Sequence, residues 1–496
     1  MKNSFLLWLF VFVLGAGLRT MHLFHPIDSG SWRENDVASI ARNYYRGGMD
    51  FLHPQIDWRG TGPGYAEMEL PVYPYMIAIC YKIFGFHESA GRIISFLFSI
   101  AALLVFFRLS QRLLKPNGAL IASLFFALSP ILLFTSNSLQ PESVMFFFYV
   151  STAYLFVRWL DSDTWLNYIL STACLTLALL SKLTAGHIGL LLLFLIIQER
   201  NIRYLFNWKV LLMGFISLAI SGVWYVYAHG LYLQYGNSLG VSNEYHWIGS
   251  DFFTNRQFIL GIIMLEIKNV IMLPALFIIA AAFFVLKPFK ENGFRFGLIW
   301  IVAVWVFYIL ACRTTSSYWA FYYHIFSVPA ISILFGYSFA QFYEKYAYQK
   351  MNKLVVVSLL SVISLSQLYF FAKATKRLSP EIDTSEYYAN VPQLKKLIPP
   401  HTTILVSGGN RLGKTGHPIA YNSSYFYYWL DCTGFNLCGE DQNIEKVRSF
   451  KDKGAQFFIA EKAWVATAGG FESDLRKDFS PVYESDNIIL FKLTHH

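Results

Sequence analysis

Charged side chains are scarce in this sequence. Only 14% of its 496 residues are Asp, Glu, Lys or Arg, while 55% are hydrophobic and the mean hydropathy is +0.41. In an average soluble protein roughly a quarter of the residues are charged. The composition therefore excludes an ordinary water-soluble chain and predicts that lipid is its main solvent.

Cysteine is also rare, because the chain has only five. Three of them, Cys80, Cys174 and Cys312, fall within or beside apolar runs. This leaves Cys432 and Cys438 as the candidates for a disulfide bond. The sequence contains no Gly-rich nucleotide loop and no HExxH, CxxC or nucleophile-elbow pattern. These absences argue against a disulfide framework, a zinc site and a nucleotide-binding domain.

The net charge of +9 could indicate a nucleic-acid-binding protein. However, the Lys and Arg residues form short clusters between apolar runs rather than one basic surface, which argues against nucleic acid as a partner. Aromatic residues make up 18% of the chain, and this share suits helices that face lipid and end in aromatic belts at the interface.

Long apolar runs are the main feature that is present. A helix needs roughly 17 to 25 apolar residues to cross a bilayer core of about 30 Å. The chain is therefore expected to be mainly α-helical, a polytopic bundle of about 11 to 13 spans. Expected spans lie near residues 4–23, 89–113, 117–136, 139–160, 164–181, 184–199, 208–228, 269–287, 295–312, 320–343 and 353–373. The shorter run 72–86, interrupted by Pro74 and Lys82, is expected along the interface.

Basic residues predict the orientation of these spans, because short cytoplasmic connections are rich in Lys and Arg. If the first run is a retained signal anchor with Lys2 inside, every second connection should be basic. The clusters follow this pattern at Arg112 and Lys115, at Arg158, at Arg200, Arg203 and Lys209, at Lys287, Lys290 and Arg295, and at Lys345, Lys350 and Lys353. The first outer loop, residues 22–88 with its juxtamembrane helices, and the tail after Phe371 are therefore expected outside.

The tail regains charge and changes character. We expect a transmembrane domain over residues 1–375 and a small extracytoplasmic α/β domain over residues 376–496. Strand-like and helix-like runs alternate in the tail, with strands expected at Thr403–Ser407, Gln456–Ile459 and Ile488–Lys492 and helices at Val391–Leu397 and Asn443–Lys453.

The first outer loop holds two carboxylates, Glu34 and Asp36. The apolar residues Val37, Ile40 and Tyr44 recur at helical spacing, so Asp36 is expected near a helix start. A helix cap would explain an acidic residue there. The functional alternative is catalysis, because a carboxylate can accept the proton of an attacking hydroxyl. Acidic residues beside a membrane are not needed for anchoring, which favours the catalytic interpretation.

Three further charged residues lie at membrane boundaries. Glu69, before Pro71, is either solvated or orients an acceptor or a lysine. Glu142 lies near the start of a span, where a structural and a functional role are both open. Lys182 separates two apolar runs on the expected outer side. Its side chain either snorkels to the headgroups or pairs with the phosphate of an anionic lipid carrier.

Arg313 and His324 occupy the outer ends of two later spans, with Tyr322 and Tyr323 between them. An aromatic belt would explain the tyrosines. Arg313 could join Lys182 in holding a phosphate. His324 is more typical of a satisfied packing residue than of a catalyst.

A series of short motifs follows in order along about the first two-thirds of the chain. They are Trp32-Arg33-Glu34-Asn35-Asp36, Ile40-Ala41-Arg42-Asn43, Glu69-Leu70-Pro71-Val72-Tyr73, Tyr81-Lys82-Ile83-Phe84-Gly85, Arg92, Leu128-Ser129-Pro130, Gln140-Pro141-Glu142, Ser181-Lys182 and Tyr322-Tyr323-His324 before Pro329. In this order they resemble the integral membrane glycosyltransferases that use polyprenyl-phosphate sugars, the group of the bacterial lipid A aminoarabinose transferases and the protein O-mannosyltransferases.

The resemblance implies a GT-C fold, an outward-facing site, a donor taken from the bilayer and inversion at the anomeric carbon. It implies that Asp36 is the catalytic base, with Glu34 as the substitute candidate, since the acidic pair of the family is often adjacent whereas Asn35 separates the two here. The residues expected to bind substrate are Arg33, Glu69, Glu142, Lys182, Arg313, Tyr323 and His324. Because aminoarabinose transferases tend to have lysine at the position of Glu69, the donor or acceptor is expected to differ from theirs.

We therefore expect a hexosyl- or pentosyltransferase of a bacterial inner membrane, with its site and tail on the periplasmic side. Its partners would be a polyprenyl-phosphate sugar, the bilayer and an acceptor hydroxyl on a lipid, glycan or protein. Asp36 and Lys182 are expected to face one water-accessible hollow. No cofactor is expected, and a divalent metal ion is not indicated. The alternatives are a transporter or flippase of lipid-linked sugars and a polymerase or ligase of surface polysaccharide.

Overall fold

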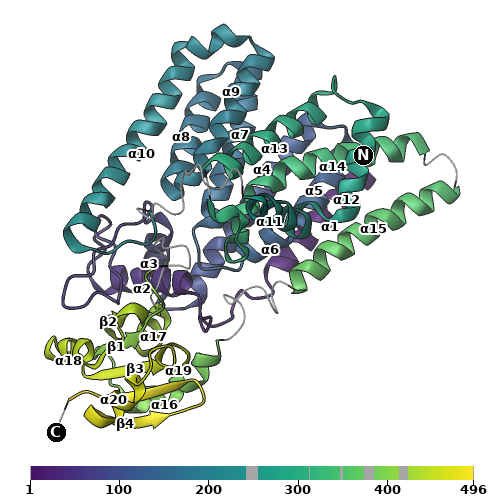
Figure 1. Cartoon of the computed structure of the whole chain (residues 1–496). Coiled ribbons are helices and arrows are strands. Elements are labelled where there is room, and N and C mark those ends of the chain that lie inside the picture. Colours follow the sequence, from purple (N-terminus) through teal and green to yellow (C-terminus); the bar gives the residue numbers. More distant parts are fainter. Residues whose placement is uncertain are drawn as a thin grey trace. The chain divides into compact units, whose positions relative to one another are not determined.

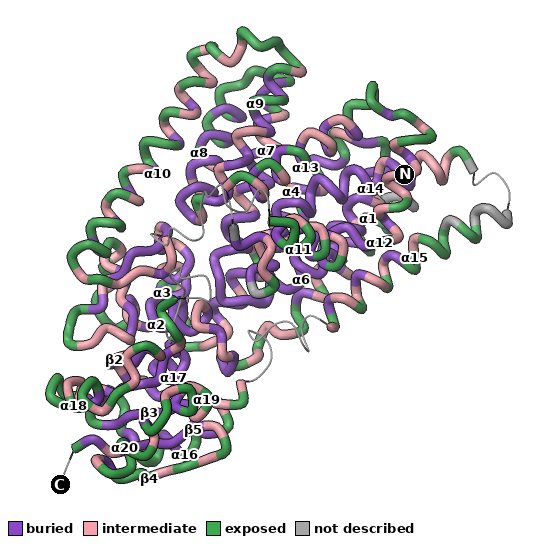
Figure 2. The backbone as a smooth tube through the Cα atoms, in the orientation of Figure 1, coloured by how far each residue is buried: buried purple, intermediate pink, exposed green. Residues whose placement is uncertain are grey.

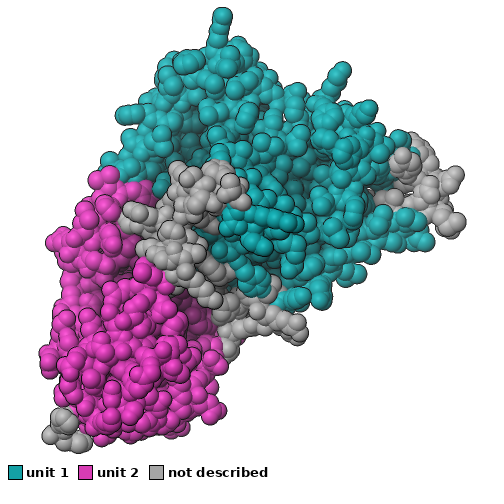
Figure 3. Space-filling view, in the orientation of Figure 1, with its two compact units in different colours: residues 1–23, 92–224, 246–378 teal, residues 24–91, 225–245, 379–496 magenta. Residues whose placement is uncertain are grey.

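A computed structural model describes residues 2–241, 255–311, 313–346, 350–373, 385–412 and 423–494 (Figure 1). Internal contacts divide the chain into two compact units (Figure 3). Unit 1 comprises residues 1–23, 92–224 and 246–378, and unit 2 comprises residues 24–91, 225–245 and 379–496. The first outer loop and the tail therefore belong to the same unit, although more than 280 positions separate them in the sequence.

Helices dominate the chain outside the tail. The α-helices are α1 (Lys2–Arg19), α2 (Trp32–Arg46), α3 (Val72–Phe84), α4 (Ser89–Leu113), α5 (Pro116–Ala127), α6 (Pro130–Thr135), α7 (Glu142–Ser162), α8 (Trp165–Ser181), α9 (Ile188–Glu199), α10 (Trp208–Tyr235), α11 (Arg256–Glu266), α12 (Leu273–Ala281), α13 (Asn292–Ala311), α14 (Val328–Tyr346) and α15 (Lys350–Lys373). Short 3-10 segments are η1 (Leu183–His187), η2 (Ile202–Phe206), η6 (Arg313–Ser316) and η7 (Tyr318–Ser327), and π-helical turns are η4 (Ile267–Ile271) and η5 (Ala282–Leu286). The expected mainly α-helical class is confirmed.

By length and composition, five helices in the described residues could cross a membrane, or six if a bent pair counts as one span. Six further apolar helices have 10–17 residues, and among these Val72–Phe84 corresponds to the expected interfacial helix. The expected span 117–136 is divided into two short helices, α5 and α6. Pro130 at the start of α6 explains the interruption, because proline cannot continue the helix that precedes it. The bent pair, Arg256–Ile271 and Leu273–Leu286, meets at 91° just before Pro274.

Burial distinguishes inner from outer helices (Figure 2). In the apolar window of Ala320–Lys345, which includes most of α14, 83% of the residues are buried, against 22% for the window of α10. Small residues allow α14 to pack closely on α5, because a Cβ placed on Gly336 would lie 2.5 Å from the carbonyl oxygen of Gly118. Close approach at small residues is how membrane helices associate without a hydrophobic driving force.

The tail of unit 2 contains one five-stranded sheet. Its strands are β1 (Thr403–Ser407), β2 (Thr433–Leu437), β3 (Phe457–Glu461), β4 (Ser480–Glu484) and β5 (Ile488–Lys492), in the order β2-β1-β3-β5-β4. The β1 strand is parallel to β2 and β3, while β5 is antiparallel to β3 and β4. The helices are α16 (Val391–Leu397), α17 (Ser424–Leu430), α18 (Ile444–Asp452), α19 (Lys462–Val465) and α20 (Phe471–Asp478), with 3-10 turns η9 (Glu386–Asn390) and η10 (Gly439–Asp441). The small C-terminal α/β domain is thus present.

Helices cover both faces of this sheet. The chain leaves β1 toward β2 on one side and returns from β2 to β3 on the other, so right-handed crossovers place α17 and α18 on opposite faces. One hydrophobic core joins Val447 of α18 and Leu475 of α20 to Leu405, Phe458 and Phe491 of the strands. The expected pairing of Cys432 and Cys438 is wrong, because both cysteines are free. They flank the five extended residues of β2, which span more than a disulfide can bridge.

Glu461 at the end of β3 is a buried carboxyl group that makes the tail sensitive to pH. Burial raises the pKa of Glu461 to about 7, although hydrogen bonds from the hydroxyls of Tyr425, Ser423 and Tyr387 lower it. The folded chain therefore holds this proton more tightly than the unfolded chain. The protonated Glu461 therefore contributes to the free energy of unfolding. This contribution is fully present below pH 4.5 and is lost as the pH rises through about 7.

We expect Glu461→Gln to raise the Tm of the purified chain at pH 8 and to change it little at pH 5. At pH 8 the native chain must bury the carboxylate, at a cost on the order of 3 kcal/mol that the neutral amide avoids. The matched control is Glu472→Gln, since Glu472 is an exposed acid of α20 in the same domain. A variant that is less stable than the native chain at pH 8 would contradict the prediction.

Candidate functional site

The α2 helix begins with a serine N-cap that involves one of the two candidate acids, Glu34. Ser31 is the N-cap, and its hydroxyl accepts the backbone N–H of Glu34 at 3.3 Å. The carboxylate of Glu34 accepts a hydrogen bond from the Ser29 hydroxyl at 2.9 Å. Serine is a preferred residue at the N-cap, because its hydroxyl satisfies a free backbone N–H of the first turn. Glu34 therefore has a structural role at the helix start.

Asp36 lies in the second turn of α2, beyond the cap. The helix-cap interpretation is thus wrong for Asp36, because Ser31 fills that position. The side chain of Asp36 is fully buried, and its Oδ1 accepts the indole N–H of Trp58 at 2.9 Å. A buried carboxylate held by one directed donor has a defined orientation, which a proton acceptor in catalysis requires. The role of Asp36 as the base, with Glu34 as the substitute, stays a prediction.

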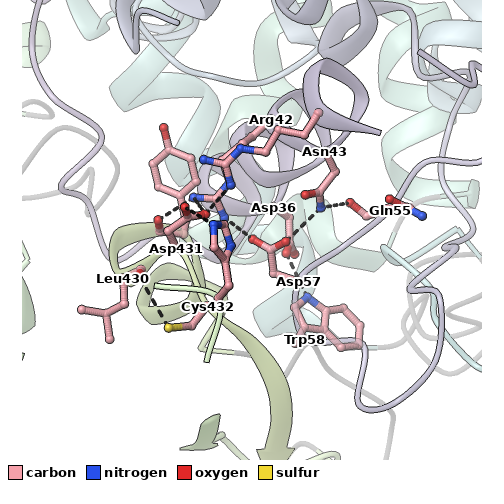
Figure 4. Close-up of polar contacts among 12 residues, drawn as sticks. Asp36, Arg42, Asn43, Gln55, Asp57, Trp58, Leu430, Asp431 and Cys432 are labelled. Carbon is pink, nitrogen blue, oxygen red and sulfur yellow. Dashed lines mark hydrogen bonds and ion pairs between the residues drawn. The ribbon is translucent and has the colours of Figure 1, made fainter. Parts of the chain in front are cut away.

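Next to Asp36 lies a buried ion network that the sequence did not predict (Figure 4). On the last turns of α2, Arg42 donates to Asp57 Oδ2 at 2.5 Å and Asn43 donates to Asp57 Oδ1 at 2.9 Å. The same guanidinium lies 3.1 Å from Asp431 of the tail. Burial alone would raise the pKa of Asp431, but the hydrogen bond from Arg46 and the charges of Arg42 and Arg46 lower it.

Two predicted substrate-binding residues of the first loop contact each other. Arg33 forms an ion pair with Glu69 and also donates to the backbone oxygen of Leu239 at 3.3 Å. Glu69 is buried, so the interpretation as a merely solvated residue is wrong. Its partner is an arginine rather than a lysine. A role of this pair in binding substrate stays a prediction.

The residues that follow α10 are bound to the first loop through Glu67, which the sequence did not single out. Its backbone bonds to Asn237 and Leu239, and its carboxylate accepts from Ser238 at 2.6 Å and lies 3.2 Å from the ring of His229. Residues 242–254, which continue this segment, lie outside the described residues.

Within unit 1, Lys182 is surrounded by predicted site residues. Its ammonium forms an ion pair with Glu142, the first residue of α7. It also lies 4.8 Å from the ring centre of Tyr322 and 4.7 Å from that of Tyr323. The side chain of Lys182 is only 17% exposed, so these contacts surround most of it, and its pairing with a lipid phosphate stays a prediction. The arrangement forms a cation held between an acid and two aromatic faces, to which a phosphate can bind in exchange for the carboxylate.

His324 is fully buried and belongs to a second cluster in unit 1. Its Nδ1 lies 2.5 Å from Glu266 Oε1, and its Nε2 lies 2.7 Å from the carbonyl oxygen of Thr315. Ser327 donates to the same Glu266 oxygen at 2.8 Å. Both ring nitrogens of His324 therefore lie within hydrogen-bond distance of an oxygen atom. This geometry agrees with a packing residue. Of Arg313 only the backbone, in η6, is among the described parts of the chain.

The predicted site residues thus fall into two groups. Arg33, Glu34, Asp36 and Glu69 belong to unit 2, whereas Glu142, Lys182, Arg313, Tyr323 and His324 belong to unit 1. The expectation that Asp36 and Lys182 face one hollow stays a prediction. In the part of the chain that the structure describes, no three His, Cys, Asp or Glu side chains are grouped closely enough to hold a metal ion.

Known proteins match this chain in sequence. Residues 68–226 match the family described as dolichyl-phosphate-mannose-protein mannosyltransferase. Two proteins of Aquifex aeolicus, both described as uncharacterized, are also similar. One is 26% identical over 317 residues, which cover 63% of this chain and 68% of the relative. The other is 24% identical over 356 residues, which cover 69% of this chain and 66% of the relative.

Solved structures match the fold over nearly the whole chain. ArnT from Cupriavidus metallidurans bound to undecaprenyl phosphate is 12% identical, with 98% of each chain covered and a TM-score of 0.63. The archaeal oligosaccharyltransferase AglB from Archaeoglobus fulgidus, in complex with an inhibitory peptide and a dolichol-phosphate, is 11% identical, with 98% of this chain and 74% of that chain covered and a TM-score of 0.54. The mycobacterial arabinofuranosyltransferase AftD is 11% identical, covers 98% of this chain and 41% of that chain, and has a TM-score of 0.53.

These structural matches define the fold class of the chain. The protein is an integral membrane protein with the GT-C fold, as the motifs of the first two-thirds of the chain implied. The family match over residues 68–226 supports a glycosyltransferase of this class.

Proposed function

We propose that this chain is an inverting glycosyltransferase that moves a sugar from a polyprenyl phosphate to an acceptor hydroxyl at the outer face of a bacterial inner membrane. The observation that carries the proposal is Asp36, a buried carboxylate in the first outer loop oriented by the indole of Trp58. It occurs in a chain with the GT-C fold and a glycosyltransferase family match. A base and a lipid-activated sugar are sufficient for the reaction, which needs no nucleotide.

The reaction is a direct displacement. Asp36 accepts the proton of the acceptor hydroxyl while its oxygen forms a bond to the anomeric carbon. The bond from that carbon to the phosphate oxygen breaks, and the polyprenyl phosphate leaves with the electron pair. Attack on the face opposite the leaving group inverts the anomeric configuration. No covalent enzyme intermediate is formed.

The leaving phosphate gains negative charge in the transition state, and Lys182 is the cation proposed to balance it. Its present partner, Glu142, is an anion that a phosphate must replace. The aromatic faces of Tyr322 and Tyr323 keep the ammonium in place during this exchange. A cation that is already oriented costs no reorganisation at the moment of reaction. Arg313 is proposed as a second phosphate ligand.

One observation favours a transporter of lipid-linked sugars as the second candidate. Transporters often have interrupted helices with polar residues at the interruption. Here Arg256–Ile271 and Leu273–Leu286 are bent by 91°, and Glu266 near the bend forms a buried pair with His324. A bent pair of this kind is either a broken span or a re-entrant loop. An assay of product formation and of transport therefore separates a transferase from a transporter.

The test uses the purified full-length chain in nanodiscs with a radiolabelled polyprenyl-phosphate sugar and extracts of envelope lipids, glycans and proteins as acceptors. A transferase yields labelled product and releases polyprenyl phosphate, and the product has the inverted anomeric configuration by NMR. A transporter yields no product but moves labelled donor across the membrane of sealed vesicles. Transport without product would overturn the proposal.

A further inference from the structure

The first outer loop and the tail share main-chain hydrogen bonds within unit 2. The β2 strand lies at the edge of the sheet, and its Gly434 donates to the carbonyl oxygen of Asp57 at 3.1 Å. Gly60 in turn donates to the carbonyl oxygen of Gly434 at 2.7 Å. A Cβ on Gly434 would lie 1.8 Å from the Ile404 oxygen, so only glycine fits at this position. The tail therefore sets the backbone position of the segment 57–60, which carries Trp58.

Side chains connect the same two parts of unit 2. Arg42 lies between two carboxylates, Asp57 of the loop and Asp431 of the tail. It also donates to the backbone oxygen of Tyr428 at 2.9 Å, at the end of α17. Arg42 and Asp57 are both buried, so their positions depend on their charged partners rather than on solvent. Asp57 immediately precedes Trp58, whose indole N–H binds Asp36.

We infer that Asp431 of the tail is a positioning residue for Asp36. The connection runs from Asp431 through Arg42 to Asp57, and from there to the indole of Trp58 (Figure 4). Asp431 does not touch the reacting atoms, and it acts by fixing the guanidinium that orients the loop. This inference rests on the proposed function, because it assigns a role to the tail in the same reaction.

Loss of Asp431 removes one of the two carboxylates that hold Arg42. The guanidinium then keeps Asp57 and the backbone oxygen of Tyr428 as partners but loses its second charged partner, so the side chain of Asp57 next to Trp58 is held less firmly. A displacement of about 1 Å in a reacting group can lower a rate by about 100-fold. We therefore expect Asp431→Asn to lower kcat by about 10- to 100-fold, while the KM for the donor changes by less than about twofold, because the proposed donor ligand, Lys182, does not belong to this network.

The decisive experiment is a double-mutant cycle on kcat in the full-length chain. Trp58→Phe removes the indole N–H that binds Asp36 but still places an aromatic ring at this position. It should lower kcat by about 10- to 100-fold. The double variant of Asp431→Asn and Trp58→Phe should be no slower than Trp58→Phe alone, because both changes interrupt one connection. Both single variants should move the acid limb of the pH profile of kcat to higher pH, by up to about one unit.

The matched control is Asp478→Asn, which removes a tail carboxylate whose ion-pair partner, Arg448, belongs to α18 of the tail rather than to the network of Arg42. It should leave kcat and the pH profile unchanged. Additive losses in the double variant, or equal losses in Asp431→Asn and Asp478→Asn, would overturn the inference. If Asp431→Asn yields no folded protein by size-exclusion chromatography, the same cycle is run with Asp431→Glu, which keeps the charge and displaces it by one methylene.

The failure of this inference is distinguishable from the failure of the proposed function. Retained transfer in Asp36→Asn would reject Asp36 as the base. Asp431 would then have no catalytic residue to position. Loss of transfer in Asp36→Asn together with an additive cycle would leave the transferase proposal intact and reject only the role of the tail.

Discussion

Asp36→Asn is expected to lower the rate of sugar transfer by about 10²- to 10⁴-fold, the usual contribution of a general base. The amide has nearly the same volume as the carboxylate, and its oxygen can still accept the indole N–H of Trp58. The fold should therefore be retained, and the loss should appear in kcat rather than in the KM for the donor. Turnover of radiolabelled polyprenyl-phosphate sugar measures the rate, and size-exclusion chromatography and Tm measure the fold.

Glu34→Gln is the matched control for this prediction. Glu34 lies on the same turn of α2 but contributes to the cap at Ser31, where a neutral side chain can still accept the Ser29 hydroxyl. Its effect on turnover should stay within about threefold, since a capping interaction contributes about 1 kcal/mol to stability rather than to the transition state. If Glu34→Gln abolishes transfer while Asp36→Asn does not, the base is Glu34.

Lys182→Met is expected to produce the second large effect, a loss of transfer of about 100-fold or more, because a cation at a developing negative charge contributes that much to a rate. Methionine fills a similar volume but carries no charge. The substitution also leaves the buried carboxylate of Glu142 without its cation, which should lower the free energy of unfolding by about 3 kcal/mol. Activity and stability should therefore fall together.

The double variant Glu142→Gln and Lys182→Met separates these two effects. With both charges removed, no buried charge is left unpaired, and the Tm should return close to the native value. Transfer should remain as low as in Lys182→Met, because the phosphate still has no cation. Recovery of transfer along with stability would show that Lys182 has only a structural role.

Much of the tail was predictable because its elements have local signals. The predicted strands Thr403–Ser407 and Ile488–Lys492 match β1 and β5, and the predicted helix Val391–Leu397 matches α16. These runs have clear apolar patterns and defined ends. The β2 strand, with its glycine and asparagine, has weak strand propensity, and α17 is a short aromatic run that does not favour a helix.

The candidate site was predictable only in part. Asp36 and Glu34 could be selected because they lie on one short helix beside a membrane span. The network around Asp57 could not, because the partner of Arg42 in the tail is nearly 390 positions away and no local pattern connects them. Glu266 did carry a signal, since a carboxylate in an apolar helix indicates a buried partner. That partner is His324, whose role as a packing residue the sequence favoured.

The pairing of Gly434 with the segment 57–60 has a consequence for biosynthesis. The ribosome completes the first loop early, whereas β2 emerges more than 370 residues later. At about 5 to 20 residues per second this interval lasts on the order of half a minute. Until the last part of the chain is translated, the loop has no strand edge to bind, so a nascent or truncated protein can insert into the membrane before the segment 57–60 reaches its final position.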